Sequence, residues 1–283
     1  MQENSFINSY RYILGILLAE IIIIQVSGVS FHAITGNALF SLNVDPFTWL
    51  PFIAAIPKFI LQRYPVALAF DLCMVTGIIF LILKPMRQLR GIVVFLLMFL
   101  FYVTLMSRHI HWNFQVGMFL ILFPLCFRAY QAKLFAFEAL RFFLLFFYAS
   151  AGFLKIVYGA YLKSDHLSHL LVGQFGPYFI EGNTGWRTQL HLLLVNTPAL
   201  SYGLFIGSMA LELFAFTGFF TKKFDPFIAM ALLLFHLANW VIMDIAPFGQ
   251  IAFVCLLFFS KSIFNSDGHL TATLQQQVDL EHP

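Results

Sequence analysis

Residues 134–162 read LFAFEALRFFLLFFYASAGFLKIVYGAYL. A helix needs about 20 mostly apolar residues to cross the hydrocarbon core of a bilayer, so this stretch predicts a membrane-spanning helix. Its last third carries Lys155. Because an amine inside a membrane is costly, we interpret Lys155 as a functional residue or as a charge with a dedicated partner. The alternative is that its long stem lifts the ammonium group into the outer headgroup region.

The composition of the whole chain agrees with a membrane location. Of 283 residues, 60% are hydrophobic and only 10% are charged, whereas a soluble domain has about a quarter charged residues. The chain is therefore predicted to be an all-α polytopic integral membrane protein. A net charge of +3 gives no reason to expect a nucleic-acid partner. The three cysteines lie singly in apolar runs and predict neither disulfides nor a metal cluster.

The hydropathy pattern predicts about eight spans in a single domain covering 1–264. They lie near 11–34, 66–84, 90–107, 114–129, 134–157, 202–221, 225–243 and 248–264. The first run is longer than a signal-peptide core, so we expect it to be retained as an anchor. Pro46–Leu61 contains two further prolines and favours an interfacial or re-entrant helix. The polar tail 265–283 is expected to be disordered.

The basic residues predict the orientation. With eight spans, the even-numbered connections and the two termini carry nine lysines and arginines, and the longer odd-numbered connections carry five. The positive-inside rule then predicts that both termini are cytoplasmic. The expected location is the cell (inner) membrane. The longest connection, 158–201, faces outward. Glycines in 173–178 and 181–186 predict turns there, and His191–Val195 could lie on the membrane interface as a cap.

Two helices carry polar side chains at helical spacing. Arg141, Tyr148 and Lys155 recur every seven residues and share one face of their helix. Glu138 is expected to pair with Arg141 as an ion pair at the helix end. In the span 225–243, His236 and Asn239 are expected to face the same way, with Trp240 packed on the imidazole. These two side chains serve either chemistry or hydrogen bonding between helices.

Three acidic residues lie in other apolar spans: Glu20, Asp71 and Glu212. A carboxylate in a membrane helix must be paired, protonated or exposed to water. Together with Lys155 and His236, they predict a shared polar interior. Such an interior would be a reaction chamber or a substrate path.

A further cluster, Arg108-His109-Ile-His111-Trp112-Asn113, follows the third span. Two histidines in a loop could ligate a metal, but no carboxylate or cysteine lies nearby. An interfacial anchor of arginine, tryptophan and histidine is the favoured alternative.

These segments, taken in order, resemble the membrane domain of the vitamin K-dependent gamma-carboxylases, also called the horizontally transferred transmembrane (HTTM) domain. The matching motifs are Tyr148-x-x-Ala151-Gly152-x-x-Lys155, Leu211-Glu212 with Gly218, and Phe235-His236-x-x-Asn239, with a looser echo at Trp112-Asn113. The resemblance covers roughly 100–260. The earlier spans fit by hydropathy alone.

The resemblance implies a membrane enzyme in which Lys155 takes a proton from vitamin K hydroquinone or another quinol. His236 and Asn239 would assist as catalytic residues. The pocket would include Tyr148, Glu212, Trp240, His109, His111, Trp112 and Asn113. The expected partners are the lipid bilayer and a small secreted peptide as substrate. A non-catalytic role stays open: a maturation, export or immunity factor for such a peptide, or a small transporter.

Overall fold

The computed structural model describes residues 2–33, 35, 56–106, 116–182, 184–245, 247 and 249–264. Within these ranges the secondary structure is helical and contains no strand, which confirms the predicted all-α class. The predicted pocket residues His109, His111, Trp112 and Asn113 lie outside the described residues. So do positions 46–55 of the expected interfacial helix and the tail 265–283. Residues 56–61 form the short helix α3, Ile56–Leu61.

Six helical segments are long and apolar enough to cross a membrane. The helices that form them are α1 (Gln2–Val26), α4 (Tyr64–Leu83), α5 (Gln88–Met106), α7 (Tyr130–Val157), α10 (Pro198–Phe214, extended by a 3₁₀ turn to Phe219) and α11 (Asp225–Met243). A multi-pass membrane protein is therefore supported. They correspond to six of the eight expected spans.

The other two expected spans form shorter apolar segments in the structure. The span expected at 114–129 consists of α6 (Gly117–Leu120) and a 3₁₀ turn at Phe123–Cys126, which contains Pro124. Proline has no amide hydrogen and does not continue an α-helix. The span expected at 248–264 is α12, Ile251–Phe264. The count of eight crossings stays a prediction.

Helix α1 begins and ends about eight residues earlier than expected. The first ten residues were expected to precede the span because several are polar, yet Phe6 and Tyr10 are fully buried. Their rings lie 6.2 and 5.9 Å from the ring of Phe137. The helix ends at Val26 because a turn follows, in which Gly28 has a left-handed φ of 78°.

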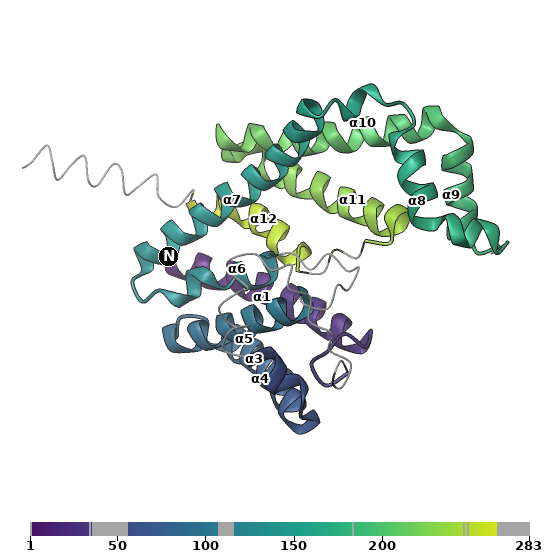
Figure 1. Ribbon diagram of the computed structural model, residues 1–283. Helices are drawn as coiled ribbons and strands as arrows, with labels where there is room; N and C mark the ends of the chain where they lie inside the picture. The colour runs from purple at the N-terminus through teal and green to yellow at the C-terminus, as the bar shows by residue number, and fades with distance from the viewer. Residues whose placement is uncertain are drawn as a thin grey trace, which may run out of the picture. The chain divides into compact units, whose positions relative to one another are not determined.

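The chain divides into two compact units, 1–141 with 248–283, and 142–247; the boundary lies inside α7. In the first unit, α1 packs against α4 and α12, and α4 packs against α5 (Figure 1). Close approach of the segments depends on glycine. A Cβ on Gly117 would lie 2.6 Å from the carbonyl oxygen of Gly249, and a Cβ on Gly91 would overlap the carbonyl oxygen of Leu125.

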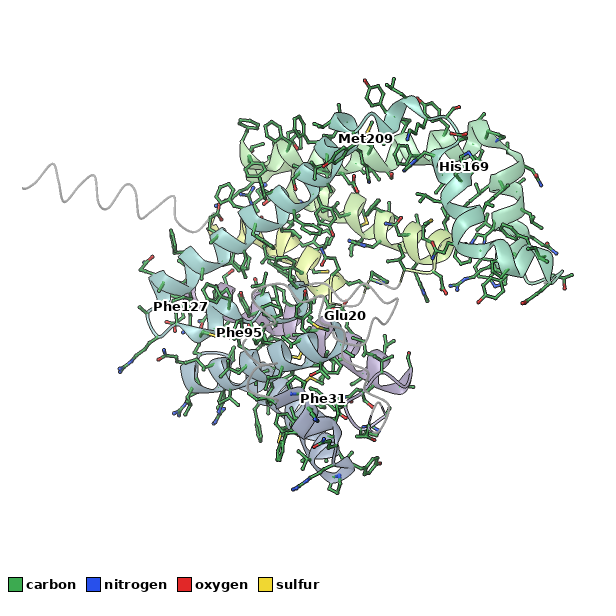
Figure 2. The ribbon with its side chains drawn as sticks, viewed as in Figure 1. Glu20, Phe31, Phe95, Phe127, His169 and Met209 are labelled. Atoms are coloured by element: carbon green, nitrogen blue, oxygen red, sulfur yellow. The ribbon has the colours of Figure 1, made fainter. Side chains whose placement is uncertain are left out.

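Two buried carboxylates hold the first unit together. Glu20, labelled in Figure 2, is 3% exposed. Its oxygens accept hydrogen bonds of 3.1 Å from the amides of Gly249, Ile251 and Ala252, where α12 begins. The first amides of a helix have no partner within the helix, so a carboxylate from another helix satisfies them.

Asp71 has the same role in the turn after α1. It accepts hydrogen bonds from the amides of Phe31 (3.0 Å) and His32 (2.9 Å), and it lies 2.7 Å from Nδ1 of His32. Both of these buried acids thus bind backbone amides within their own unit. The expectation that they share one polar interior with Lys155, Glu212 and His236 stays a prediction.

In the second unit, residues 158–201 fold differently from the expected turn-rich loop. They form α8 (His166–Ile180) and α9 (Trp186–Asn196), which pack side by side (Figure 1). Buried Leu171 and Phe175 of α8 meet Leu194 of α9. This apolar face outweighs the local turn signals, so Gly173, Gly176 and even Pro177 lie inside α8.

Candidate functional site

The second unit contains a cavity of about 800 Å³. Its lining comes from the end of α7, from α8, from α10 and from α11 and the residues after it, and most of it is apolar. The polar lining side chains are Lys155, His166, Ser208 and Asn239. A concave, mostly apolar site with a few polar groups is the usual form of a small-molecule pocket, and this volume lies in the usual range.

Lys155 has a dedicated partner. Its Nζ lies 2.6 Å from both carboxylate oxygens of Glu212. Glu212 is 4% exposed, and the lysine side chain is 30% exposed. The ammonium group also lies 6.0 Å from the ring centres of Phe205 and Phe235. Of the two initial interpretations of Lys155, the geometry favours a paired charge over a side chain extended toward headgroups.

Gly152, one turn before Lys155, allows this pairing. A Cβ at this position would lie 3.1 Å from Cβ of Glu212 and 3.1 Å from the amide nitrogen of Leu213. Such distances are tighter than ordinary van der Waals contact. The missing side chain therefore brings the backbone of α7 close to α10 at the level of the acid.

Tyr148 and His236 form a second polar pair. The phenol oxygen of Tyr148 is within hydrogen-bonding distance of Nε2 of His236, and the two ring centres are 5.7 Å apart. Tyr148 is buried. The phenol donates to an unprotonated Nε2 or accepts from a protonated one, according to the tautomer.

His236 and Asn239 do not face the same way. Asn239 lines the cavity, whereas His236 contacts Tyr148 and is not among the lining residues. Residues three apart on a helix differ by about 60° in direction, which is enough to separate them. Trp240 does not line the cavity and is 44% exposed. Among the predicted site residues that the structure describes, Lys155, Glu212 and Asn239 therefore belong to the cavity region.

Glu138 and Arg141 form the expected ion pair, with Nη1 of Arg141 3.3 Å from Oε1 of Glu138. The expected location at a helix end is wrong. The structure starts α7 at Tyr130, so Arg141 lies about three turns inside the helix, where its side chain is buried.

Three side chains of α8 and α9 fasten this hairpin to the end of α11. Nε2 of His191 donates to the carbonyl oxygen of Ile242, and Nε2 of Gln174 donates to that of Met243, both at 2.8 Å. Nη1 of Arg187 lies 2.5 Å from the carboxylate of Asp244. The last carbonyls of a helix lack partners within it, so His191 and Gln174 satisfy two of them. We call these three contacts the hairpin clamp.

The hairpin clamp is expected to weaken at acid pH. Burial, helped by the charge of Arg187, lowers the pKa of His191 below its ordinary 6.5, although the bond to Ile242 and the charge of Asp244 oppose the shift. At a pH between the lowered pKa and 6.5, His191 is therefore neutral while the hairpin is bound to α11, but it takes up a proton when the hairpin detaches. The free energy of detaching the hairpin should fall as the pH drops below about 6.5 and level off below the lowered pKa.

Hydrogen exchange of the α9 amides, measured at about pH 7.5 and about pH 5.5 and corrected for intrinsic rates, checks this expectation. His191→Gln is the control, because its amide still donates to Ile242 but does not titrate. The wild type should lose protection at the lower pH while the variant does not. Equal losses in the two proteins would contradict the assignment to His191.

Several lining residues were missed from the sequence: His166, Gly203, Phe205 and Gly207. One signal was available. Gly203-Leu-Phe-Ile-Gly207 is a pair of glycines four residues apart in an apolar helix, a spacing that marks a face open to close approach. His166 and Phe205 are in ring contact, with centres 4.9 Å apart, and no sequence spacing links them.

Within the part of the chain that the structure describes, no three histidine, cysteine, aspartate or glutamate side chains gather as a metal site would require. The polar groups at the cavity are the Lys155–Glu212 pair, the imidazole of His166, the hydroxyl of Ser208 and the amide of Asn239. Comparison of the chain with protein-family models, with curated proteins and with solved structures finds no match.

Proposed function

We propose that the second unit binds a membrane-dissolved quinol in the cavity and removes a proton from one of its hydroxyl groups. The observation that carries this proposal is the Lys155–Glu212 pair at a largely apolar cavity, in a unit built from membrane-spanning helices. A polar ring with an apolar body suits a pocket of this composition. The resemblance to the carboxylase membrane domain supports vitamin K hydroquinone, or a related quinol, as the ligand.

The charges of the lining favour an uncharged ligand. The positive charge of Lys155 is already matched by the negative charge of Glu212. The other polar lining groups are an amide, a hydroxyl and an imidazole. An anionic lipid would have to displace Glu212 from Lys155 and leave a buried carboxylate without its partner. A neutral hydroxyl requires no such exchange.

The pair can also supply the base. In the proposed step, one proton passes from the ammonium group of Lys155 to the carboxylate of Glu212, which leaves a free amine beside a neutral acid. The free amine of Lys155 then accepts the proton of the ligand hydroxyl, giving an ammonium group beside a quinolate oxygen. Charge and protons balance, and the new ion pair stabilises the product.

The remaining polar residues have supporting roles in this proposal. Asn239 lines the cavity and offers an amide donor for a quinol oxygen. His236, held by Tyr148, acts as a positioning residue for the segment of α11 that carries Asn239.

Six or eight crossings are both even, so both termini would lie on one side of the membrane. With eight crossings, the excess of basic residues supports the cytoplasmic side of a cell membrane for both termini. With eight crossings α7 is the fifth span, and Lys155 at its far end would lie toward the outer face; with six crossings α7 is the fourth span and Lys155 would lie toward the cytoplasmic face.

Binding of 2-methyl-1,4-naphthoquinol to the full-length protein in nanodiscs, under anaerobic conditions, tests the proposal. We expect saturable binding by the wild type, weakened about tenfold or more in Lys155→Ala. The matched control is Lys163→Ala, because Lys163 is exposed and does not line the cavity. Equal binding by wild type and Lys155→Ala, or no binding by either, would reject the proposal in favour of a non-catalytic role.

A further inference from the structure

One wall of the cavity is bare backbone. Gly203 and Gly207 of α10 both line it, and a Cβ added at either position would meet no atom within 4 Å. They are four residues apart and so lie on the same helical face, one turn from each other. Leu204 and Ser208, which follow them, also line the cavity. A side chain at position 203 or 207 would project into the cavity, and glycine leaves that space open.

Two other glycines of the second unit, Gly152 and Gly218, have a different use. A Cβ on Gly218 would lie 2.7 Å from Cδ2 of Leu145 and 3.1 Å from Cδ1 of Ile228, and Gly152 lies similarly close to Glu212 and Leu213. Those two allow protein segments to pack. Gly203 and Gly207 touch no segment of the unit in this way, so packing within the chain does not account for them.

We propose that Gly203 and Gly207 are specificity-determining residues, which admit the apolar tail of the quinol along α10 while its ring lies near Lys155 and Asn239. This inference rests on the proposed function and goes further by naming the ligand as a tailed quinol. The lining of α10 runs from Gly203 to Leu211, a length of roughly 12 Å. That length exceeds a bicyclic ring and leaves room for part of a hydrocarbon tail.

The apolar lining continues this path beyond the glycines. Leu167 and Leu170 of α8, with Ile242 and Met243 of α11, line the same cavity. These side chains would lie around a tail and shield it from water.

A second transmembrane helix is the rival occupant, because paired glycines also mark helix–helix contacts. The size of the cavity argues against it. A helix is roughly 11 Å across, so a space of about 800 Å³ would hold roughly 8 Å of one, little more than a turn. Leucines of α8 and α11 also line the cavity, so the glycine face of α10 is only one of its walls. A narrow, flexible chain fits this space better than a helix does.

The test compares two probes in nanodiscs: 2-methyl-1,4-naphthoquinol, and the same ring carrying an isoprenoid tail of four units. Dissociation constants are measured for wild type, Gly203→Leu, Gly207→Leu and the milder Gly207→Ala. Gly173→Leu is the matched control, since Gly173 lies in α8, has open space around it and does not line the cavity. Using the ratio of each variant to wild type removes the effect of tail partitioning into lipid.

We expect Gly207→Leu and Gly203→Leu to weaken binding of the tailed probe about tenfold or more, Gly207→Ala to weaken it less, and Gly173→Leu to leave it unchanged. Binding of the tail-less ring should change less than about threefold in all four. The graded effect of alanine keeps the test informative if a leucine variant does not fold.

Three results would overturn the inference. If Lys155→Ala weakens binding but the glycine variants bind the tailed probe as the wild type does, the ligand does not lie along α10, although the proposed function stands. If the wild type binds neither probe, the proposed function fails as well. If the wild type is dimeric in nanodiscs and Gly207→Leu makes it monomeric, the face is an interface with a second copy.

Discussion

Replacing Glu20 with alanine is expected to lower the free energy of unfolding by about 3 kcal/mol or more. The substitution leaves three buried amides at the start of α12, those of Gly249, Ile251 and Ala252, without their acceptor. Each orphaned amide costs about 1–3 kcal/mol. Reversible unfolding in mixed micelles measures the loss.

Two controls separate this effect from a general intolerance of substitution in α1. Glu3→Ala removes an exposed acid from the same helix, whose charge acts on Lys133, and should change stability by less than about 1 kcal/mol. Glu20→Gln keeps one acceptor oxygen and should fall between the two alanine variants. If Glu20→Ala were as stable as Glu3→Ala, the carboxylate would not be holding α12.

The second large effect is expected at the Lys155–Glu212 pair. Lys155→Met leaves the buried carboxylate unpaired, and Glu212→Leu leaves the ammonium group unpaired, so each should cost about 3 kcal/mol. The double variant replaces both charges by apolar side chains and should recover most of the loss. Thermal unfolding in nanodiscs gives the coupling energy from this double-mutant cycle.

Lys155→Arg separates the structural role from the chemical one. Its guanidinium group can pair with Glu212 but does not give up a proton in proteins, so stability should be kept while quinol deprotonation is lost. Formation of quinolate, followed by absorbance under anaerobic conditions, is the readout. Proton removal by Lys155→Arg at the wild-type rate would exclude Lys155 as the base and leave it as a structural charge.

Hydropathy alone predicted most of the fold. The six long helices, and with them the depth of Lys155 and Glu212, follow from runs of about 20 apolar residues. The helices α8 and α9 did not follow, because Gly173, Gly176 and Pro177 are strong local turn signals. The apolar face through Leu171 and Phe175 that overrides them becomes decisive only when Leu194 packs against it.

The sequence singled out the polar residues Tyr148, Lys155, Glu212, His236 and Asn239 one by one, but not as pairs. Lys155 and Glu212 are 57 positions apart, and Tyr148 and His236 are 88 apart. No periodicity within one helix links positions on two helices. Glu20 and Glu212 were likewise indistinguishable, since each is an acid in an apolar run. Only the tertiary structure shows that one binds backbone amides and the other binds a lysine.

The position of the Glu20 partners along the chain has a consequence for biosynthesis. The amides that Glu20 binds lie 229 to 232 positions further along the chain. The whole of 142–247 is synthesised in between. At about 5–20 residues per second, a ribosome takes roughly 11–46 s to synthesise the stretch of chain from Glu20 to these amides. During this interval α1 is already in the membrane with a carboxylate whose permanent donors do not yet exist. The first unit is therefore completed last, and a chain that stops before α12 would present an unsatisfied acid to the machinery that removes misfolded membrane proteins.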